Sequence, residues 1–571
     1  MHDTVIRNGL IVDGTGRPGF YGDVAIDKGR IAQVGGKAAR GRREMQADGR
    51  LVTPGFIDAH THYDGQVTWD RWLSPSCWHG VTTVVMGNCG VGFAPARPDK
   101  HDWLIGLMEG VEDIPGTALH EGIPWGWETF PEYLDLLDTM PRAIDVGAQA
   151  THATIRAYVM GERGAGNEPA DSQDLSDMAG LVKEAINAGA LGFTSSRTTF
   201  HRTRDGQHIP GYEVAFEELI HLARAMGETG TGTLGLNMDF DQVEQDFAWI
   251  RKVQQASKRP VWFLLSQFND NPGIFSRLLD QTAQAAAAGE DIRPQVAGRP
   301  IGFILGLNSS LHPFISRPSY KAIAHLPLAE RIAMLRDPDF RKKLLAESVE
   351  HKSDIMRTVT QRFDRMFRLG NPPNYEPEPQ SSVAWIAAGK GLSPAEVALD
   401  MLLERDGQEF IFMPAFNYAA GDLSDVRTML VDPNTVLGLS DAGAHCGLVC
   451  DVSTPTFMLT HWARDRTRGP KLALEEVVRA QTSGTAGLYG LADRGMLKAG
   501  MKADINIIDF ERLSLKAPEM VYDLPAGGKR LIQHATGYAA TLVNGEPIFE
   551  QGVATGAMPG RLIRGAQRSS A

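Results

Sequence analysis

The chain has 571 residues, 43% of them hydrophobic, and a formal net charge of −12 that is spread along its length. This composition is typical of a large globular enzyme with an ample core. The acidic balance argues against nucleic acid or an anionic membrane surface as a partner.

Two further features bear on location. No stretch reaches the roughly 18 apolar residues that a membrane span needs, and residues 1–4 lead into a strand pattern without a signal peptide. The cysteines are too few for a disulfide framework; they are Cys77, Cys89, Cys446 and Cys450. They suit a reducing compartment, where a thiolate is free to bind a metal. The sequence therefore predicts a cytoplasmic protein.

Both ends of the chain show the alternating pattern of β-strands. At the N-terminus the pattern covers 5–9, 23–27 and 30–34, and near the C-terminus it covers 503–509 and a hairpin at 540–549. We expect the two regions to form one small sheet domain. The last residues, 556–571, are predicted to be a tail, because the basic residues there favour a frayed end over a binding patch.

Between these regions, strand-like runs alternate with helical stretches. Eight such runs favour an α/β fold, a (β/α)8 TIM-type barrel whose site lies at the C-terminal strand ends. They are 56–62, 81–87, 143–150, 190–196, 231–236, 260–266, 301–307 and 435–440.

Two stretches do not fit this alternation. An extra strand-like run at 410–413 has no assigned place. The stretch 308–392 is too long for one loop and holds a charged helix pair at 328–351 and a proline-rich segment at 371–377. It is predicted to be an insertion over one side of the barrel mouth.

His60 and His62 follow a run at 51–57 that predicts a buried strand entered through Pro54 and Gly55. Residues two apart on a strand point the same way, so both imidazoles would leave the strand end side by side and bind one metal ion. The alternative is a pair of histidines in a turn with no ligand.

Two more residues of metal-binding type follow strand-like runs. Cys89 comes directly after the second run, and Asp441 ends the eighth. A buried structural cysteine and a turn-capping aspartate are the alternatives. Together with His60 and His62 they offer nitrogen, sulfur and carboxylate ligands, which favour Zn²⁺ over Mg²⁺ or Ca²⁺.

This ligand set indicates a reaction class. Bound zinc polarises a carbonyl and lowers the pKa of a water molecule to near 7. Asp441 beside that water is a plausible general base that returns the proton to a leaving amine. The sequence therefore predicts metal-assisted hydrolysis of an amide C–N bond in a small-molecule substrate.

The chain resembles the amidohydrolase superfamily and, more closely, the N-acyl-D-amino-acid deacylases (D-aminoacylases). The resemblance rests on 52–62, 80–90 and 438–445, and on 497–504, which matches the closing signature of the superfamily. It implies a β-sandwich domain from 1–54 and 485–555, a metal-dependent hydrolase barrel at 55–484 with an insertion at about 308–392, and hydrolysis of N-acyl amino acids, favouring the D configuration.

The chain departs from the family pattern at the fifth and sixth strands. The resemblance implies one histidine at the end of each. Here the fifth strand offers only Gly235 or Asn237, and Gln267 follows Ser266 in the sixth. We therefore expect a site for about one zinc ion per chain, and the losses leave open an altered or lost activity.

Four further residues are weaker candidates for substrate binding. His152 ends the third run, where it would donate to an oxyanion or be structural. Arg197 would bind a substrate carboxylate bidentately or form a structural salt bridge. His201 follows the same strand as Arg197, and His445 would orient Asp441 or contact substrate.

Other functions stay open. A cyclic-amide hydrolase of the hydantoinase type usually uses a carboxylated lysine near the fourth strand, and 190–196 contains no lysine. Hydrolysis of another amide is a further alternative, as is a metal-free binding protein that kept the barrel. The substrate's chirality and acyl group, and the choice between a monomer and a homo-oligomer, are not fixed by the sequence.

Overall fold

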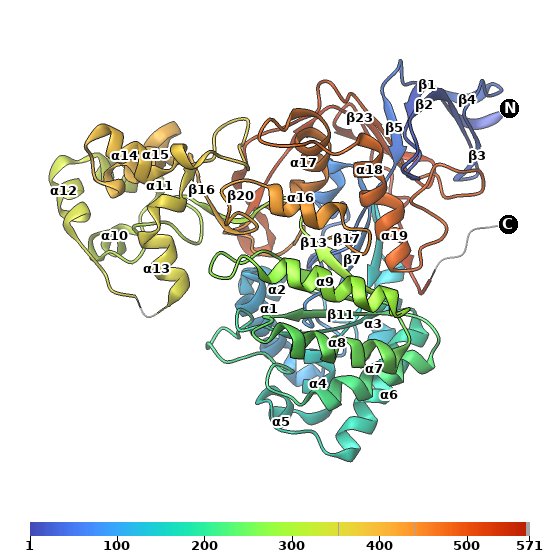
Figure 1. Cartoon of the computed structure of the whole chain (residues 1–571), viewed down its shortest axis with the longest axis horizontal. Helices are drawn as coiled ribbons and strands as arrows, with labels where there is room; N and C mark the ends of the chain where they lie inside the picture. Colours follow the sequence, from blue (N-terminus) through green and yellow to red (C-terminus); the bar gives the residue numbers. More distant parts are fainter. Residues whose placement is uncertain (352, 439, 567–571) are drawn as a thin grey trace.

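The computed structural model describes residues 1–351, 353–438 and 440–566. Figure 1 shows a body of strands and helices, a sheet at the upper right that contains the N-terminus, and a helical lobe on the left. Part of the predicted eighth run, residue 439, and the last basic residue of the predicted tail, Arg568, lie outside the described residues.

A nine-stranded sheet is built from both ends of the chain. Its path runs β25-β24-β23-β18-β5-β1-β2-β3, and β4 pairs with β1. The strands are β1 (His2–Ile11), β2 (Phe20–Asp27), β3 (Arg30–Val34), β4 (Gly41–Gln46), β5 (Leu51–Pro54), β18 (Ile505–Ile508), β23 (Tyr538–Val543), β24 (Glu546–Glu550) and β25 (Val553–Ala554). The antiparallel pairing of β18 with β5 joins the two ends, as their matching patterns predicted.

The body contains two parallel sheets. One has the order β26-β8-β7-β6 and the other β17-β13-β12-β11-β10-β9. The strands are β6 (Phe56–Asp58), β7 (Val81–Met86), β8 (Asp145–Ala148), β9 (Ala150–Thr151), β10 (Gly192–Arg197), β11 (Thr233–Met238), β12 (Val261–Leu265), β13 (Ile292–Val296), β17 (Val436–Leu437) and β26 (Leu562–Ile563). One residue separates β8 from β9, and an isolated parallel bridge links Thr61 to Ala442.

The run at 301–307 was predicted to be the seventh parallel strand, and this prediction was wrong. The parallel strand at this place is β13, which pairs with β12 and β17. The run at 301–307 contains β14 (Ile301–Leu305), which pairs antiparallel with β16 (Ile411–Phe416). That pairing also gives the unassigned run at 410–413 its place. Arg293, Pro294 and Gln295 interrupt the apolar pattern of β13, although Gln295 is fully buried.

The predicted strand at 51–57 is two strands. β5 belongs to the nine-stranded sheet and β6 to a parallel sheet, and the chain passes between them at Gly55. A Cβ on residue 55 would lie 2.2 Å from Thr82 Oγ1, so a larger residue does not fit. His60 and His62 therefore follow β6 in a loop.

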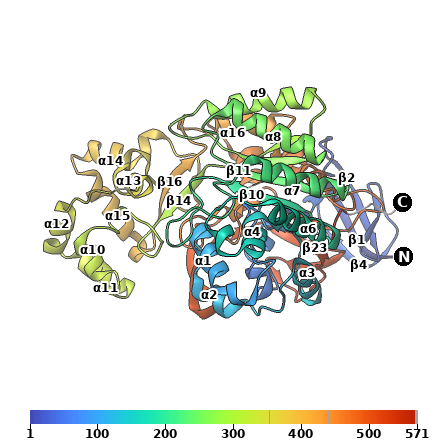
Figure 2. The ribbon, with the colours of Figure 1, turned by 90° about the horizontal axis from the view of Figure 1, so that it is seen from below.

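Helices cover the parallel strands (Figures 1 and 2). They are α1 (His101–Glu112), α2 (Gly116–Gly122), α3 (Phe130–Thr139), α4 (His152–Met160), α5 (Glu162–Ala165), α6 (Ser172–Ala188), α7 (Phe216–Glu228), α8 (Val243–Ser257), α9 (Ile274–Ala287), α16 (Ser424–Val431), α17 (Thr454–Phe457), α18 (Leu474–Arg479) and α19 (Thr485–Leu488). Asp171 and Asp174 form a capping box at the start of α6. Among the described helices, none is long and apolar enough to cross a membrane.

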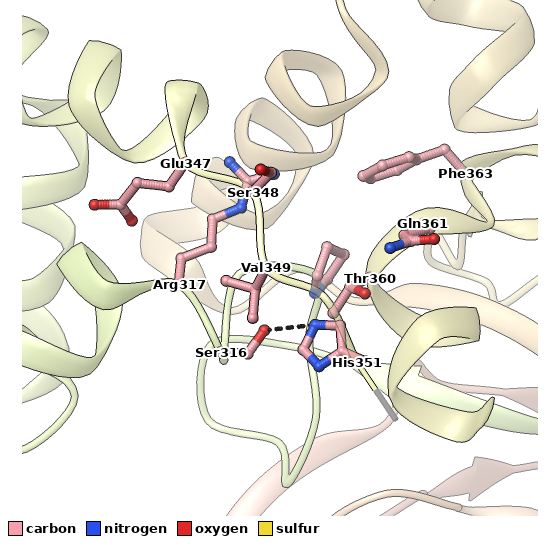
Figure 3. Close-up of a pocket in the computed structure, with 10 residues that line it drawn as sticks. Ser316, Arg317, Glu347, Ser348, Val349, His351, Thr360, Gln361 and Phe363 are labelled. Carbon is pink, nitrogen blue, oxygen red and sulfur yellow. Dashed lines mark hydrogen bonds between the residues drawn. The ribbon is translucent and has the colours of Figure 1, made fainter. Parts of the chain in front are cut away.

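Helices from the stretch 308–392, together with α15 that follows it, form the lobe on the left of Figure 1. The helix pair expected at 328–351 is α11 (Leu328–Arg336) and α12 (Pro338–Ala346), and α10 (Pro318–Ile323), α13 (Asp354–Gln361), α14 (Val383–Lys390) and α15 (Pro394–Gly407) surround it. The lobe has its own apolar cluster, which includes Leu335 and Leu402. The lobe encloses a cavity of about 260 Å³, and Ser316 Oγ lies 3.1 Å from His351 Nε2 in its lining. Figure 3 shows the side chains that line it.

The segment predicted as a tail is partly ordered against the body. Strand β26 pairs in parallel with β8, and the side chains of Leu562 and Ile563 are buried. Burial of these two apolar residues explains why this part of the segment does not fray.

Candidate metal centre

His60 and His62 stand side by side beyond the end of β6, where the loop continues toward Ala442. Their ring centroids are 5.4 Å apart, and both side chains are buried. Together with Cys89 they form a group whose ligand atoms all lie within 4.8 Å of one another. The structure therefore brings three of the four predicted metal ligands into one cluster.

Neighbouring side chains orient the two imidazoles. His60 Nδ1 donates to Gln295 Oε1 over 2.9 Å. His62 Nδ1 lies 3.3 Å from Glu112 Oε1. The hydrogen bond at Nδ1 of His60 fixes the tautomer in which its Nε2 carries the free lone pair. The Nε2 atoms of His60 and His62 both lie 3.6 Å from Asp441 Oδ1 and so face the same space.

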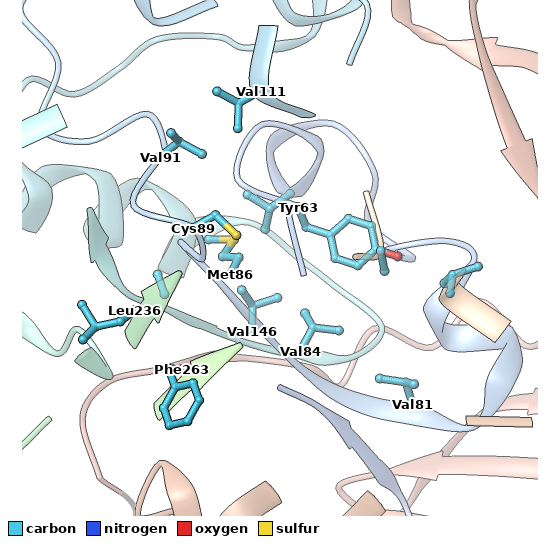
Figure 4. Close-up of a cluster of buried hydrophobic side chains, with 14 of the residues drawn as sticks. Tyr63, Val81, Val84, Met86, Cys89, Val91, Val111, Val146, Leu236 and Phe263 are labelled. Atoms are coloured by element: carbon cyan, nitrogen blue, oxygen red, sulfur yellow. The ribbon is translucent and has the colours of Figure 1, made fainter. Parts of the chain in front are cut away.

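Cys89 lies in the loop after β7 and has a backbone φ of 54°. Its Sγ is 3.4 Å from His60 Nε2. Figure 4 shows it next to Met86 in a buried cluster that includes Tyr63. Burial raises the pKa of the Cys89 thiol to about 11, so a nearby cation is needed to favour the thiolate.

Asp441 completes the cluster from the loop after β17. Its Oδ1 lies 3.6 Å from His60 Nε2 and 3.6 Å from His62 Nε2. Burial alone would raise the pKa of Asp441, but its contacts with His62 and His60 outweigh burial and lower it to about 2. The backbone φ of Asp441 is 50°, in the left-handed region that aspartate adopts more readily than most non-glycine residues.

Acidic groups around His62 favour a positive charge at this place. Burial would lower the pKa of His62, but the charge of Glu112 and the contact with Asp441 raise it well above its usual value. The same carboxylates would stabilise a bound cation. Two imidazoles, a thiol and a carboxylate are a donor set that fits zinc.

The other two candidate histidines near the cluster differ in their partners. His201 Nδ1 lies 2.9 Å from Ser196 Oγ, and its Nε2 lies 3.5 Å from Asn237 Nδ2. Asn237, the residue noted at the fifth strand, also approaches Cys89 Sγ at 3.9 Å. His445 Nε2 is 3.7 Å from Glu112 Oε2, and its side chain is 29% exposed.

His152 and Arg197 have structural partners. His152 uses both ring nitrogens, with Nδ1 2.9 Å from Ser195 Oγ and Nε2 2.8 Å from Glu218 Oε1. The Arg197 guanidinium donates to the Val214 carbonyl and lies 4.2 Å from the centre of the Phe216 ring. These contacts favour a structural role for both residues, although the partners of Arg197 are a carbonyl and a ring and not the carboxylate of the predicted salt bridge.

Gln267, which stands where the resemblance implies a histidine, binds the loop after β16. Its side-chain amide donates to the carboxylate of Asp425, in the helix α16 that follows this loop, and its Oε1 accepts from the backbone N–H of Ala419 at 2.9 Å. Asn417 Oδ1 accepts the backbone N–H of Gln267 at 2.8 Å. The side chain is therefore occupied by this loop.

Gln295 and Glu112 were missed by the sequence analysis. Gln295 lies in β13, a strand that was not predicted because polar residues interrupt its apolar pattern. Glu112 is the last residue of α1, where the helix dipole disfavours a carboxylate, and it is 1% exposed. The only feature of the sequence that pointed to Glu112 was an acidic residue at the C-terminal end of an amphipathic helix.

A small cavity adjoins Asp441. Its volume is about 30 Å³, enough for one or two water molecules, and Ala442, Cys450 and Arg530 are among its lining residues. A water molecule therefore fits next to the carboxylate.

Nitrogen, sulfur and carboxylate donors gathered at the carboxyl ends of parallel strands define a hydrolase-type site. The chain belongs to the amidohydrolase family, whose model matches residues 43–549. It is an enzyme of the class that hydrolyses carbon–nitrogen bonds, and the predicted family is confirmed.

Three similar proteins within this class have named activities. The chain is 25% identical to the D-aminoacylase of Alcaligenes xylosoxydans xylosoxydans over 98% of this chain and 97% of that protein. A solved D-aminoacylase structure, described as having a binuclear metal centre, matches with a TM-score of 0.65 at 24% identity, over 99% of this chain and all of that one. The N-acyl-D-glutamate deacylase of Bordetella bronchiseptica, solved with zinc and a phosphonate inhibitor, matches with a TM-score of 0.65 at 23% identity, over 99% of each chain. The fold is thus of the amidohydrolase type.

Proposed function

We propose that this amidohydrolase is a zinc-dependent enzyme that cleaves the amide bond of N-acyl amino acids, with N-acyl-D-amino acids as its preferred substrates. The observation that carries the proposal is the convergence of His60 Nε2, His62 Nε2, Cys89 Sγ and Asp441 Oδ1. The D configuration is proposed because the similar proteins named above act on D-amino-acid derivatives.

We propose further that the two parallel sheets are parts of one (β/α)8 barrel. Three observations support this: the single residue between β8 and β9, the bridge from Thr61 to Ala442, and the helices between successive strands. In such a barrel the loops that carry the four donors share the C-terminal face. The nine-stranded sheet would then be the core of the β-sandwich domain.

The chain's own residues supply the proton transfers. Zinc, when bound by His60, His62, Cys89 and Asp441, would polarise the substrate carbonyl and lower the pKa of a water molecule. Asp441 accepts a proton from the attacking water and delivers it to the leaving amine nitrogen. Its lowered pKa keeps the carboxylate ionised at neutral pH, the form that a general base requires.

His201 and His445 are proposed to contact the substrate. Both lie beside the cluster, and the partly exposed side chain of His445 is accessible from solvent. Burial and, to a lesser extent, the nearby histidines lower the pKa of His201 to about 3, so a neutral imidazole faces the substrate as a hydrogen-bonding group.

A hydrolase of another linear or cyclic amide is the alternative. The absence of lysine from Gly192–Arg197 counts against the hydantoinase type, which uses a carboxylated lysine near this strand. The substrate must be identified by assay.

Metal analysis and a substrate screen test the proposal. The purified protein should contain about one zinc per chain and should hydrolyse N-acyl-D-amino acids faster than their L enantiomers and faster than hydantoins. Two full equivalents bound through the fifth and sixth strand ends would overturn the single-metal proposal. A protein that binds no zinc would instead support a metal-free binding function.

A further inference from the structure

Glu112 lies between the candidate metal centre and the loop that carries Asp441. Its Oε1 is 3.3 Å from His62 Nδ1, and its Oε2 is 3.7 Å from His445 Nε2. The backbone carbonyl of Glu112 also accepts the N–H of His445. One residue of α1 therefore contacts two loops that follow β6 and β17.

The position of this carboxylate is unfavourable unless a function requires it. Glu112 ends a helix, where the dipole disfavours a negative charge, and it is fully buried. Among the described residues, Glu112 Oε1 and His62 Nδ1 have no hydrogen bond within ordinary geometry, yet they face each other. The two atoms are each other's available partner.

We propose that Glu112 is a positioning residue that holds His62 and the loop 441–445 in the geometry required for metal binding. This inference rests on the proposed function, because it takes His62 as a zinc ligand. The carboxylate accepts the Nδ1–H of His62 and so directs the Nε2 lone pair to the metal. Its carbonyl anchors His445, four residues beyond Asp441, and limits the movement of the proposed base.

The test measures zinc affinity, by competition with a chromogenic chelator, in metal-free protein. Glu112→Gln keeps the shape of the side chain but removes its charge. Partners of this kind contribute about 10- to 100-fold to metal affinity, so the zinc Kd should rise by about that factor. A Kd within about twofold of the unaltered protein overturns the inference.

Glu218→Gln is the matched control, because Glu218 is a buried carboxylate on a histidine outside the cluster. Its zinc Kd should stay unchanged. Equal losses of affinity in both variants would mean that Glu112 acts only through general stability, which also overturns the inference. If Glu112→Gln does not fold, Glu112→Asp takes its place. Its side chain is one methylene shorter, which moves the carboxylate away from His62, and its zinc Kd must be raised.

A spectroscopic measurement separates positioning from simple stability. With saturating Co²⁺ in place of zinc, Glu112→Gln should shift the visible absorption bands that report the ligand geometry, and Glu218→Gln should leave them in place. Unshifted bands in Glu112→Gln contradict the proposed role.

His62→Ala separates this inference from the proposed function. If the unaltered protein binds no zinc, or if His62→Ala binds it equally well, the proposed metal site fails. If His62→Ala loses zinc while Glu112→Gln keeps its affinity, the metal site stands and only the role of Glu112 is rejected.

Discussion

Two buried histidines in this protein are each paired with a buried glutamate, and the pairs differ at the second ring nitrogen. His152 Nε2 lies 2.8 Å from Glu218, and its Nδ1 contacts Ser195 Oγ. Glu218 also accepts from Arg156 at 2.5 Å. Both nitrogens and the carboxylate are satisfied within the protein, so this pair holds the structure together.

His62 lacks this closed set of hydrogen bonds, and its Nδ1 has no hydrogen bond within ordinary geometry. Its Nδ1 faces Glu112, while its Nε2 is directed to the space shared with His60, Cys89 and Asp441. The pair thus orients a nitrogen whose lone pair has no donor from the protein. A buried histidine is therefore a candidate ligand when the protein leaves one ring nitrogen facing a group of other potential metal ligands.

The two glutamates differ in the same way. Burial would raise the pKa of Glu218, but hydrogen bonds from His152 and Arg156 lower it to about 2. Burial raises the pKa of Glu112, and the opposing effect of His62 and His445 is smaller. A guanidinium neutralises the first carboxylate, whereas the second retains an electrostatic preference for a nearby cation.

The largest expected effect concerns Asp441, whose carboxylate lies beside His62. Asp441→Asn keeps the shape of the side chain but removes the proton acceptor. We expect kcat for the best N-acyl amino acid to fall by about 10²- to 10⁴-fold, while much of the zinc stays bound. Steady-state kinetics and metal analysis measure both. Near-normal turnover would show that Asp441 is not the base.

The pair of His152 and Glu218 should contribute more to the free energy of unfolding than the pair of His62 and Glu112. Glu218→Ala leaves Arg156 buried without its carboxylate, and breaking a buried ion pair in this way costs about 3–5 kcal/mol. Urea unfolding of the metal-free protein measures the loss. Glu112→Ala, measured in the same way, should lose less, because it removes a carboxylate that has no guanidinium partner. Equal losses would show that the guanidinium of Arg156 does not distinguish the stability contributions of the two glutamates.

The same pair predicts a dependence of stability on pH. The folded-state pKa of Glu218 is lowered to about 2 from its ordinary value of 4.5. Its stabilising contribution is therefore complete above pH 4.5 and is lost as the pH falls from 4.5 toward 2. The difference in unfolding free energy between the unaltered protein and Glu218→Gln should be constant from pH 7 to 5 and shrink below 4.5. A difference that grows on acidification would contradict the assigned contacts.

Arg197→Ala should have the smallest effect on stability and activity among these variants. Its contacts with Val214 and the Phe216 ring predict a stability loss of about 2 kcal/mol. The value of kcat/KM should change by the same factor for an N-acyl amino acid and its carboxamide analogue. A selective loss on the free carboxylate would instead restore Arg197 as the carboxylate partner.

The sequence by itself determined which side chains gather at the cluster. His60, His62, Cys89 and Asp441 each stand in a short motif beyond a strand, so local pattern was enough to select them. The meeting of both chain ends in one sheet was also predictable, because alternation is a local property of each strand. The family followed from the same motifs.

The hydrogen-bond partners of the buried polar groups could not be predicted from local sequence patterns. Gln295 lies 235 positions from His60, in a strand whose polar residues concealed it, and it orients the ring of His60. Glu112 reaches His62 from a different helix, and Glu218 turns His152 into a structural residue. Hydrogen-bond saturation depends on partners that folding brings from distant segments, and it is this saturation that separates a structural histidine from a candidate ligand.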